Sequence, residues 1–208
     1  MFLNSVQIRV AKVVSYIFHP LLMPLYLLAL LFNGDSYLQL TTPLRIQNVL
    51  YLLVGLTTVL LPVSTSFMLL KSGHIHSLQM HSAQERRLPY LLTCLFYFFT
   101  YYLLRKVQVS ALIYLLFLGA SLALLITLLI NLRWKISAHM VGIGGLLGAL
   151  AGLTYRLALD YQFVLLILIL VAGIIGSARM LLEAHSPAQL YSGFFVGVAS
   201  QLALYLLI

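Results

Sequence analysis

The sequence predicts an all-α membrane protein, a polytopic bundle of six or seven transmembrane helices. Of its 208 residues, 62% are hydrophobic and only 8% are charged, whereas about a quarter of the residues in soluble domains are charged. Apolar runs recur along the whole chain, and each is close to the roughly 20 residues that a helix needs to cross the hydrocarbon layer. The runs are continuous rather than alternating, which favours helices over the strands of a barrel.

Seven apolar segments are expected to be membrane helices, at residues 13–32, 49–70, 88–104, 109–130, 136–155, 161–178 and 189–208. The first contains Pro20 and Pro24, so two topologies remain open for it: the segment crosses the membrane, or it dips in and returns. In the third, Tyr97, Tyr101 and Tyr102 are typical of the aromatic belt at a membrane interface. The second, fourth and sixth are recognised by length and apolar composition alone.

The fifth and seventh segments carry glycines at four-residue spacing, which are Gly144, Gly148 and Gly152 in one and Gly193 and Gly197 in the other. This spacing bares one face of a helix and lets another helix approach closely. No polar stretch is long enough for a soluble domain, so we expect a single membrane domain over residues 1–208.

Polar residues gather in three of the connecting loops. If all seven segments cross, the loops around 71–87, 131–135 and 179–188 lie on the same side of the membrane. These loops and the residues next to them hold Arg86, Arg87, Lys135, Ser137, His139, Arg179 and His185. A charged residue costs about 2.5–3.5 kcal/mol at mid-bilayer even on the mildest scale. Their convergence therefore indicates a binding site for an anion, and at that depth the obvious anion is a phosphate.

The remaining composition restricts the chemistry. The chain has four carboxylates, scattered along it as Asp35, Glu85, Asp160 and Glu183, so we expect neither a two-metal hydrolase nor any other cofactor. His74 and His76 with His81 give only a weak zinc signal, since they have no cysteine partner. The 12 Lys and Arg residues are spread over short loops, which favours anionic membrane lipids over nucleic acid as partners.

Three stretches resemble the signatures of the type 2 phosphatidic acid phosphatase superfamily. Arg179, His185 and Gln189 stand at the spacing of its third signature, S-R-x5-H-x3-D. Ser137-Ala138-His139 resembles the second, P-S-G-H, and ERRLP at 85–89 is similar to the end of the first, K-x6-R-P. The resemblance implies a phosphatase-like core at about 71–208, preceded by N-terminal helices at 13–70.

The resemblance also implies a metal-independent membrane enzyme that hydrolyses a lipid phosphate or a polyprenyl pyrophosphate. His185 would attack phosphorus to form a phosphohistidine, and His139 would protonate the leaving alkoxide and then activate water. The phosphate oxygens would be held by a larger set, which comprises Arg179, Arg86 or Arg87, Ser137 and the backbone at Ala138, where free N–H groups at a helix start favour an anion.

The chain departs from the signatures at two positions that matter. The lysine of the first signature is replaced by Gln79 or Met80, and we expect Lys135 to supply the missing cation. Gln189 replaces the aspartate that orients the nucleophile, and an amide accepts a hydrogen bond but does not stabilise an imidazolium by charge. Gln189 also fits a capping box that begins at Ser186. A non-catalytic binder or carrier of anionic phospholipid is therefore the alternative function, unless Glu183 provides the carboxylate.

Orientation depends on the first segment. If it crosses, eight Lys and Arg residues lie on the site side and four on the other, and the count becomes four against four once the site cations are set aside. If it dips and returns, Arg9 and Lys12 lie on the side opposite the site. The count of Lys and Arg outside the site then favours an outward-facing site. We expect a multi-pass protein of the inner cell membrane whose site is on the outer, periplasmic face.

Overall fold

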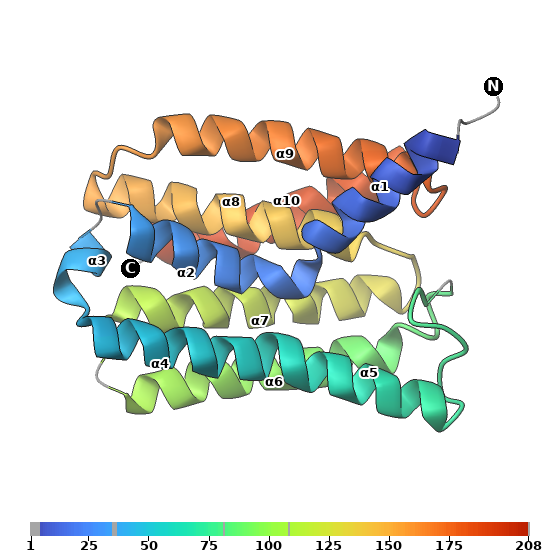
Figure 1. Ribbon diagram of the computed structural model, residues 1–208, viewed down its shortest axis with the longest axis horizontal. Coiled ribbons are helices and arrows are strands. Elements are labelled where there is room, and N and C mark those ends of the chain that lie inside the picture. Colours follow the sequence, from blue (N-terminus) through green and yellow to red (C-terminus); the bar gives the residue numbers. More distant parts are fainter. Residues whose placement is uncertain (1–4, 35–36, 81, 108, 208) are drawn as a thin grey trace.

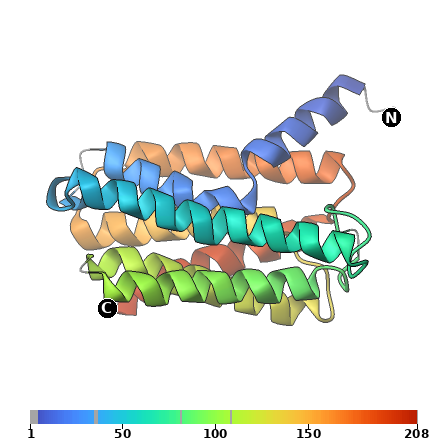
Figure 2. The same ribbon diagram turned by 60° about the horizontal axis from the view of Figure 1, so that its bottom comes forward.

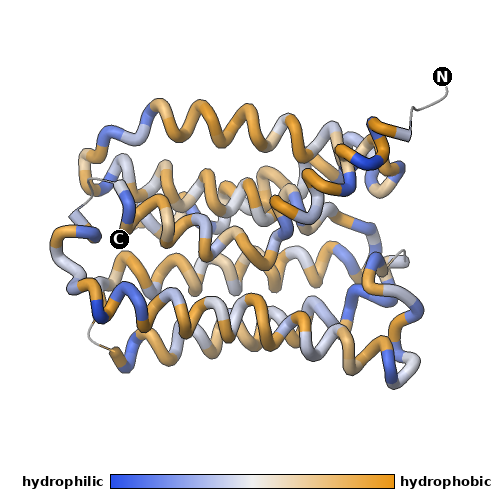
Figure 3. Tube along the Cα trace, in the orientation of Figure 1, coloured by the Kyte–Doolittle hydropathy of each residue, from blue (hydrophilic) through white to orange (hydrophobic). Residues whose placement is uncertain are grey.

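The computed structural model describes residues 5–34, 37–80, 82–107 and 109–207, and over these ranges the chain is helical and without strands. Six helical segments in this part are long and apolar enough to span a membrane, namely Ser5–Asn33, Leu44–Lys71, Ala111–Asn131, Ala138–Leu157, Gln162–Leu181 and Pro187–Leu207. The prediction of an all-α, multi-pass membrane protein is confirmed. Apolar residues occupy the middle of the bundle and polar ones gather at its two ends (Figure 3).

The helices run roughly side by side along the bundle (Figure 1). In chain order they are α1 (Ser5–Ile17), the 3₁₀ turn η1 (Pro20–Leu22), α2 (Met23–Asn33), α3 (Tyr37–Thr41), α4 (Leu44–Val54), the π-helical turn η2 (Gly55–Leu60), α5 (Leu61–Lys71), α6 (Arg87–Lys106), α7 (Ala111–Asn131), α8 (Ala138–Leu157), α9 (Gln162–Leu181) and α10 (Pro187–Leu207). Each predicted segment corresponds to one helix or to one interrupted helix. The predicted segment 88–104 is α6, which carries cations at both ends and packs along α7.

The first segment is broken in two. Pro20 has no N–H to continue the hydrogen bonding of α1, so the helix ends at Ile17 and restarts after His19. From there α2 runs along the bundle, whereas α1 leaves it at an angle and packs against α9 (Figure 2). The N-terminal end of α1 and the C-terminal end of α2 lie at opposite ends of the bundle (Figure 1). The segment therefore passes through as a bent crossing and does not dip and return.

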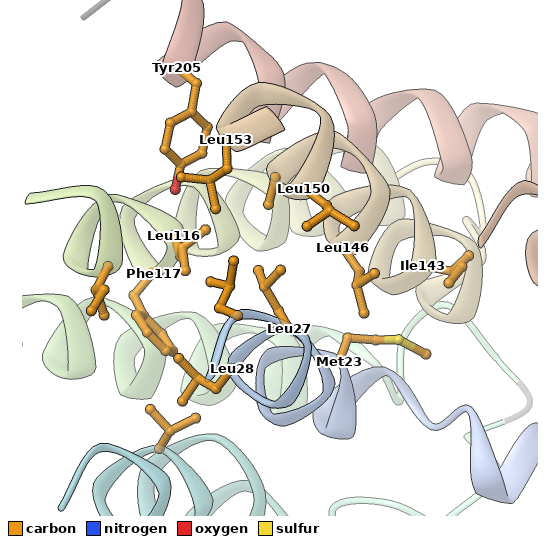
Figure 4. Packing of buried hydrophobic residues seen from close by; sticks show 14 of the residues in the cluster. Met23, Leu27, Leu28, Leu116, Phe117, Ile143, Leu146, Leu150, Leu153 and Tyr205 are labelled. Atoms are coloured by element: carbon orange, nitrogen blue, oxygen red, sulfur yellow. The ribbon is translucent and has the colours of Figure 1, made fainter. Parts of the chain in front are cut away.

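Helix α8 lies at the centre of the bundle, and its glycines allow α10 to approach it closely. A Cβ atom on Gly148 would lie 2.5 Å from the carbonyl oxygen of Val198, and one on Gly193 would lie 2.7 Å from that of Ser137. The expected close helix approach at the spaced glycines is confirmed, and the structure shows that the two glycine-bearing helices approach each other. On the opposite side of α8, Leu146 and Leu150 pack toward α2 and α7, where Leu27 and Phe117 complete the core (Figure 4).

The loops that follow α5, α7 and α9 come together at one end of the bundle, and the N-terminal end of α1 lies at that same end (Figure 1). This is the arrangement expected if every segment crosses. We call it the site end. The last residues of α10 lie at the opposite end.

Candidate functional site

A cavity of about 960 Å³ lies at the site end and extends between the helices. Its polar lining includes Lys12, His19, Arg86, Lys135, His139, Arg179, Glu183 and His185. Deeper in the bundle its walls are mostly apolar and come from α2, α5, α7 and α8, including Leu27, Val63, Phe117, Leu124 and Leu146. The cavity thus has a cationic end and a long apolar remainder.

The structure separates two neighbouring arginines that the sequence left equivalent. Arg86 lines the cavity and is 7% exposed. Its Nε donates to the carbonyl of Met80 at 2.8 Å and its Nη1 to that of Ile136 at 3.4 Å. Arg87 is exposed, and its Nη2 donates to the carbonyl of Leu132 at 3.0 Å, away from the cavity lining. Of these two arginines, Arg86 is therefore the one that lines the cavity.

Arg179 reaches the cavity from the last turn of α9. Its Nη1 donates to the hydroxyl oxygen of Ser15 on α1 at 3.2 Å. Its Nε is buried and has no hydrogen-bond partner among the described residues. A buried donor without an acceptor costs about 1–3 kcal/mol, more for a charged group. Arg179 therefore keeps donor capacity that an oxygen-rich ligand can satisfy.

The cations of the cavity have no carboxylate partner within the described ranges: no Asp or Glu lies within ion-pair distance of Arg86, Lys135 or Arg179. Burial lowers the pKa of Lys135, and the nearby positive charges of Arg86 and Arg179 lower it further. Like charges held together without counterions destabilise a folded protein. Such a cluster is suited to binding an anionic ligand.

His185 lies in the loop between α9 and α10, and its orientation is fixed by Gln189. Its Nδ1 is 3.1 Å from Oε1 of Gln189, and the backbone N–H of Ser186 donates to the same oxygen at 3.2 Å. Because a backbone N–H needs an acceptor, this second bond fixes which end of the amide faces the ring. Nδ1 of His185 therefore carries the proton, and its Nε2 keeps a lone pair. One oxygen of Gln189 both caps α10 and orients His185.

His185 stays uncharged in this setting. Burial lowers its pKa to about 3, and the charge of Arg86 adds to the effect, while the hydrogen bond to Gln189 works in the opposite direction. A neutral imidazole with a free Nε2 can act as a nucleophile. Glu183 also lines the cavity, but the side-chain partner of His185 is Gln189.

His139 lies in the first turn of α8 and is oriented by the first segment of the chain. Its Nε2 is 3.1 Å from the carbonyl oxygen of Ser15. A carbonyl only accepts hydrogen bonds, so Nε2 carries the proton and Nδ1 keeps a lone pair. Ser15 thus holds His139 through its backbone and Arg179 through its side chain.

The other residues predicted for the site surround this cluster. Ala138 and Lys135 line the cavity, and Gln79 and Met80 do so as well. Ser137 lies behind the lining, fully buried, and its N–H donates to the carbonyl of Gln189 at 3.4 Å. At this helix start the N–H of Val141 donates to the carbonyl of Ser137, and within the described residues the N–H groups of Ala138 and the two residues after it have no backbone acceptor.

Sequence reasoning missed the contribution of α1 and η1. Lys12, Ser15 and His19 all line the cavity. Their spacing of three and four residues would place them on one face of a helix, and this is the signal that could have found them.

The histidines of the loop after α5 lie away from these groups. His74 is paired through Nδ1 with the hydroxyl of Ser72 at 2.8 Å, and His76 donates its backbone N–H to Glu85 at 2.9 Å. His81 lies outside the described residues. In the part of the chain that is described, no three His, Cys, Asp or Glu residues are grouped so that they could hold a metal ion.

No protein-family model matches this chain, and neither does any curated protein or solved structure. Its chemistry must therefore be inferred from its own residues. These supply a cationic pocket continuous with an apolar cavity, and two imidazoles of opposite tautomer.

Proposed function

We propose that this protein is a metal-independent membrane phosphatase that hydrolyses a lipid phosphate or a polyprenyl pyrophosphate. The observation that carries the proposal is the cluster of Arg86, Lys135 and Arg179, which has no counterion among the described residues and lines one cavity with His139 and His185. Three cations around a neutral imidazole suit a phosphoryl group, whose negative charge is spread over several oxygens.

The shape of the cavity supports an amphiphilic substrate. A phosphate at the cationic end would leave its hydrocarbon chains among the apolar walls formed by α2, α5, α7 and α8. The cationic end lies where the membrane-spanning helices begin and end, which is the level of lipid headgroups. Neighbouring membrane lipids and the lipid phosphate itself are the partners we propose.

The two histidines provide the reaction. Nδ1 of His139 first takes the proton of the phosphate monoanion. Nε2 of His185 then attacks phosphorus, the bond to the leaving oxygen breaks, and that oxygen receives the proton from Nδ1 of His139. Water then attacks the phosphohistidine while His139 takes up a proton, which releases phosphate and restores Nε2 of His185. These are the roles implied by the resemblance to the type 2 phosphatidic acid phosphatase superfamily, in which Lys135 would stand in for the missing lysine of the first signature.

The experiment that tests this function measures phosphate release by the purified full-length protein from a panel of lipid phosphates in detergent, with EDTA present. We expect release to continue in EDTA. The alternative, a binder or carrier of anionic phospholipid, is favoured by the uncharged Gln189, and it predicts saturable lipid binding with no release from any lipid of the panel. Activity that is lost in EDTA would contradict the proposed mechanism.

Replacing Gln189 is expected to change the rate in opposite directions according to the new group. In Gln189→Glu a carboxylate of the same length can accept from His185 and Ser186, and its charge favours the developing imidazolium, so we expect kcat to rise about 10-fold. Gln189→Leu removes the acceptor and should lower kcat about 10- to 100-fold. Both are checked by steady-state phosphate release, with lipid affinity as the control. Equal kcat in the two variants would exclude Gln189 from the reaction.

We further propose that the protein resides in the inner membrane with its site on the outer, periplasmic face. The bent first segment places Lys12 in the cavity lining and Arg9 on the same helix. The cations outside the cavity lining then divide equally, as Arg9, Lys71, Arg87 and Arg133 at the site end and Arg45, Arg105, Lys106 and Arg156 at the other. Charge gives no preference in this arrangement. The outward orientation is supported by the resemblance alone.

A further inference from the structure

A third histidine faces the cavity from the break in the first segment. His19 lies between α1 and η1, lines the cavity, and packs edge to face against His139, with ring centroids 5.7 Å apart and an interplanar angle of 76°. None of the three motif-like stretches includes this part of the chain. The break at Pro20 turns the chain and places the imidazole beside the proposed phosphate pocket. A straight helix would instead continue along the axis of α1.

The local backbone fixes the tautomer of His19. The N–H of Leu21 donates to Nδ1 of His19 at 3.4 Å, which makes the side chain the N-terminal cap of η1. A ring nitrogen that accepts a hydrogen bond carries no proton, so the proton is on Nε2. Nε2 has no hydrogen-bond acceptor among the described residues. His19 therefore presents a neutral donor to the cavity.

Among the described residues, none of the acceptors that line the cavity is hydrogen-bonded to this donor. The charged side chains that line the cavity with His19 are four cations, Lys12, Arg86, Lys135 and Arg179, and one carboxylate, Glu183, so positive charge predominates. The Ser15 carbonyl is already bound to His139. A ligand with several acceptor oxygens and no need to donate would satisfy this donor together with the cations.

We propose that His19 is a third histidine of the site, and that its Nε2–H donates to an oxygen of the bound phosphate group. The inference rests on the proposed function only in taking the ligand to be a lipid phosphate. His19 has a different role from the other two histidines, since it neither attacks phosphorus nor transfers a proton, because its Nδ1 is occupied by the cap. It contributes binding from a part of the chain outside the three motif-like stretches.

Two substitutions separate this role from that of a helix cap. In His19→Asn the side-chain oxygen can take the place of Nδ1 and accept from Leu21, but nothing replaces Nε2. In His19→Gln the amide nitrogen can take the place of Nε2, while the capping acceptor is lost. His19→Asn thus removes the donor to phosphate and keeps the helix cap. His19→Gln keeps the donor and removes the cap.

The measurement is the affinity for dioleoyl phosphatidic acid in detergent micelles, made in a His185→Ala background so that turnover plays no part. Dioleoylglycerol, which lacks the phosphate, serves as the control lipid. We expect His19→Asn to weaken phosphatidic acid binding about 10- to 100-fold, as for loss of a hydrogen bond to a charged group. We expect His19→Gln to stay within about 3-fold of the parent, below the loss of one such bond.

The opposite order, with Asn binding like the parent and Gln weakened, would show a cap alone and overturn the inference. Equal weakening of phosphatidic acid binding in both variants would also overturn the inference, because binding would then not depend on the donor that His19→Gln keeps. Hydrolysis is judged separately, in proteins that retain His185. If these bind phosphatidic acid with the expected order but release no phosphate from any lipid, the phosphatase proposal fails and the role of His19 stands.

Discussion

Replacing His185 with alanine is expected to abolish phosphate release, lowering kcat by at least about 1000-fold. The removal of a nucleophile that forms a covalent intermediate leaves only the contribution of binding and electrostatics to the rate. No other group stands in the same relation to Gln189, whose oxygen holds Nδ1 of His185 at 3.1 Å. The measurement is phosphate release from the lipid that the wild-type protein hydrolyses fastest, at saturating concentration.

The matched control for His185→Ala is His74→Ala. His74 is an exposed histidine in the loop after α5, and its ring contacts Ser72. This variant should retain wild-type kcat. Lipid affinity should be largely kept in His185→Ala, because Arg86, Lys135 and Arg179 are unchanged. A release rate within tenfold of wild type in His185→Ala would remove the phosphohistidine from the mechanism.

Replacing Gly197 with alanine is expected to destabilise the bundle by about 3 kcal/mol or more, near the upper range of overpacking costs. A Cβ atom on Gly197 would collide with the carbonyl oxygen of Val141 and lie 2.5 Å from the backbone nitrogen of Gly145. Backbone atoms of α8 do not move aside as the end of a flexible side chain does. Helices α8 and α10 would have to separate, and their first turns carry His139 and Gln189.

Gly173→Ala provides the control for this substitution. Gly173 lies in the membrane-spanning helix α9, and nothing lies within 4 Å of a Cβ built on it. Both variants are compared by thermal unfolding and by the fraction that elutes as a single species in detergent. Gly197→Ala should lose both unfolding temperature and homogeneity, and Gly173→Ala neither. Equal unfolding temperatures would mean that the α8–α10 crossing tolerates an added methyl group.

The fold followed from the sequence because membrane spans are set by local composition. Twenty apolar residues predict a helix whatever its neighbours, and the four-residue spacing of Gly144 and Gly148 predicts a bare face. The meeting of three polar loops at one end follows from the number of crossings, whereas the identity of α10 as the helix on the bare face is seen only in the structure. Figure 1 shows both outcomes.

Only part of the candidate site could be predicted from the sequence, because several of its contacts join residues that are far apart in the chain. His139 and Ser15 are separated by 124 positions, and Arg179 and Ser15 by 164. No local signal links them. Arg86 and Arg87 look alike in sequence, and only the phase at which α6 begins decides which of them faces the cavity. The sequence allows Gln189 to be a cap or the partner of His185, and the structure shows one oxygen in both roles.

The hydrogen bond between Ser15 and His139 has a consequence for how the protein tolerates change. The acceptor belongs to the backbone, so the bond does not depend on which amino acid occupies position 15. What it requires is the direction of the chain there, which is set by the break at His19 and Pro20. A related protein could have another amino acid at position 15 and still orient the histidine equivalent to His139. A substitution that straightened the first segment would remove this hydrogen bond. This part of the site depends on the path of the backbone. A sequence motif, which specifies only side chains, does not describe it.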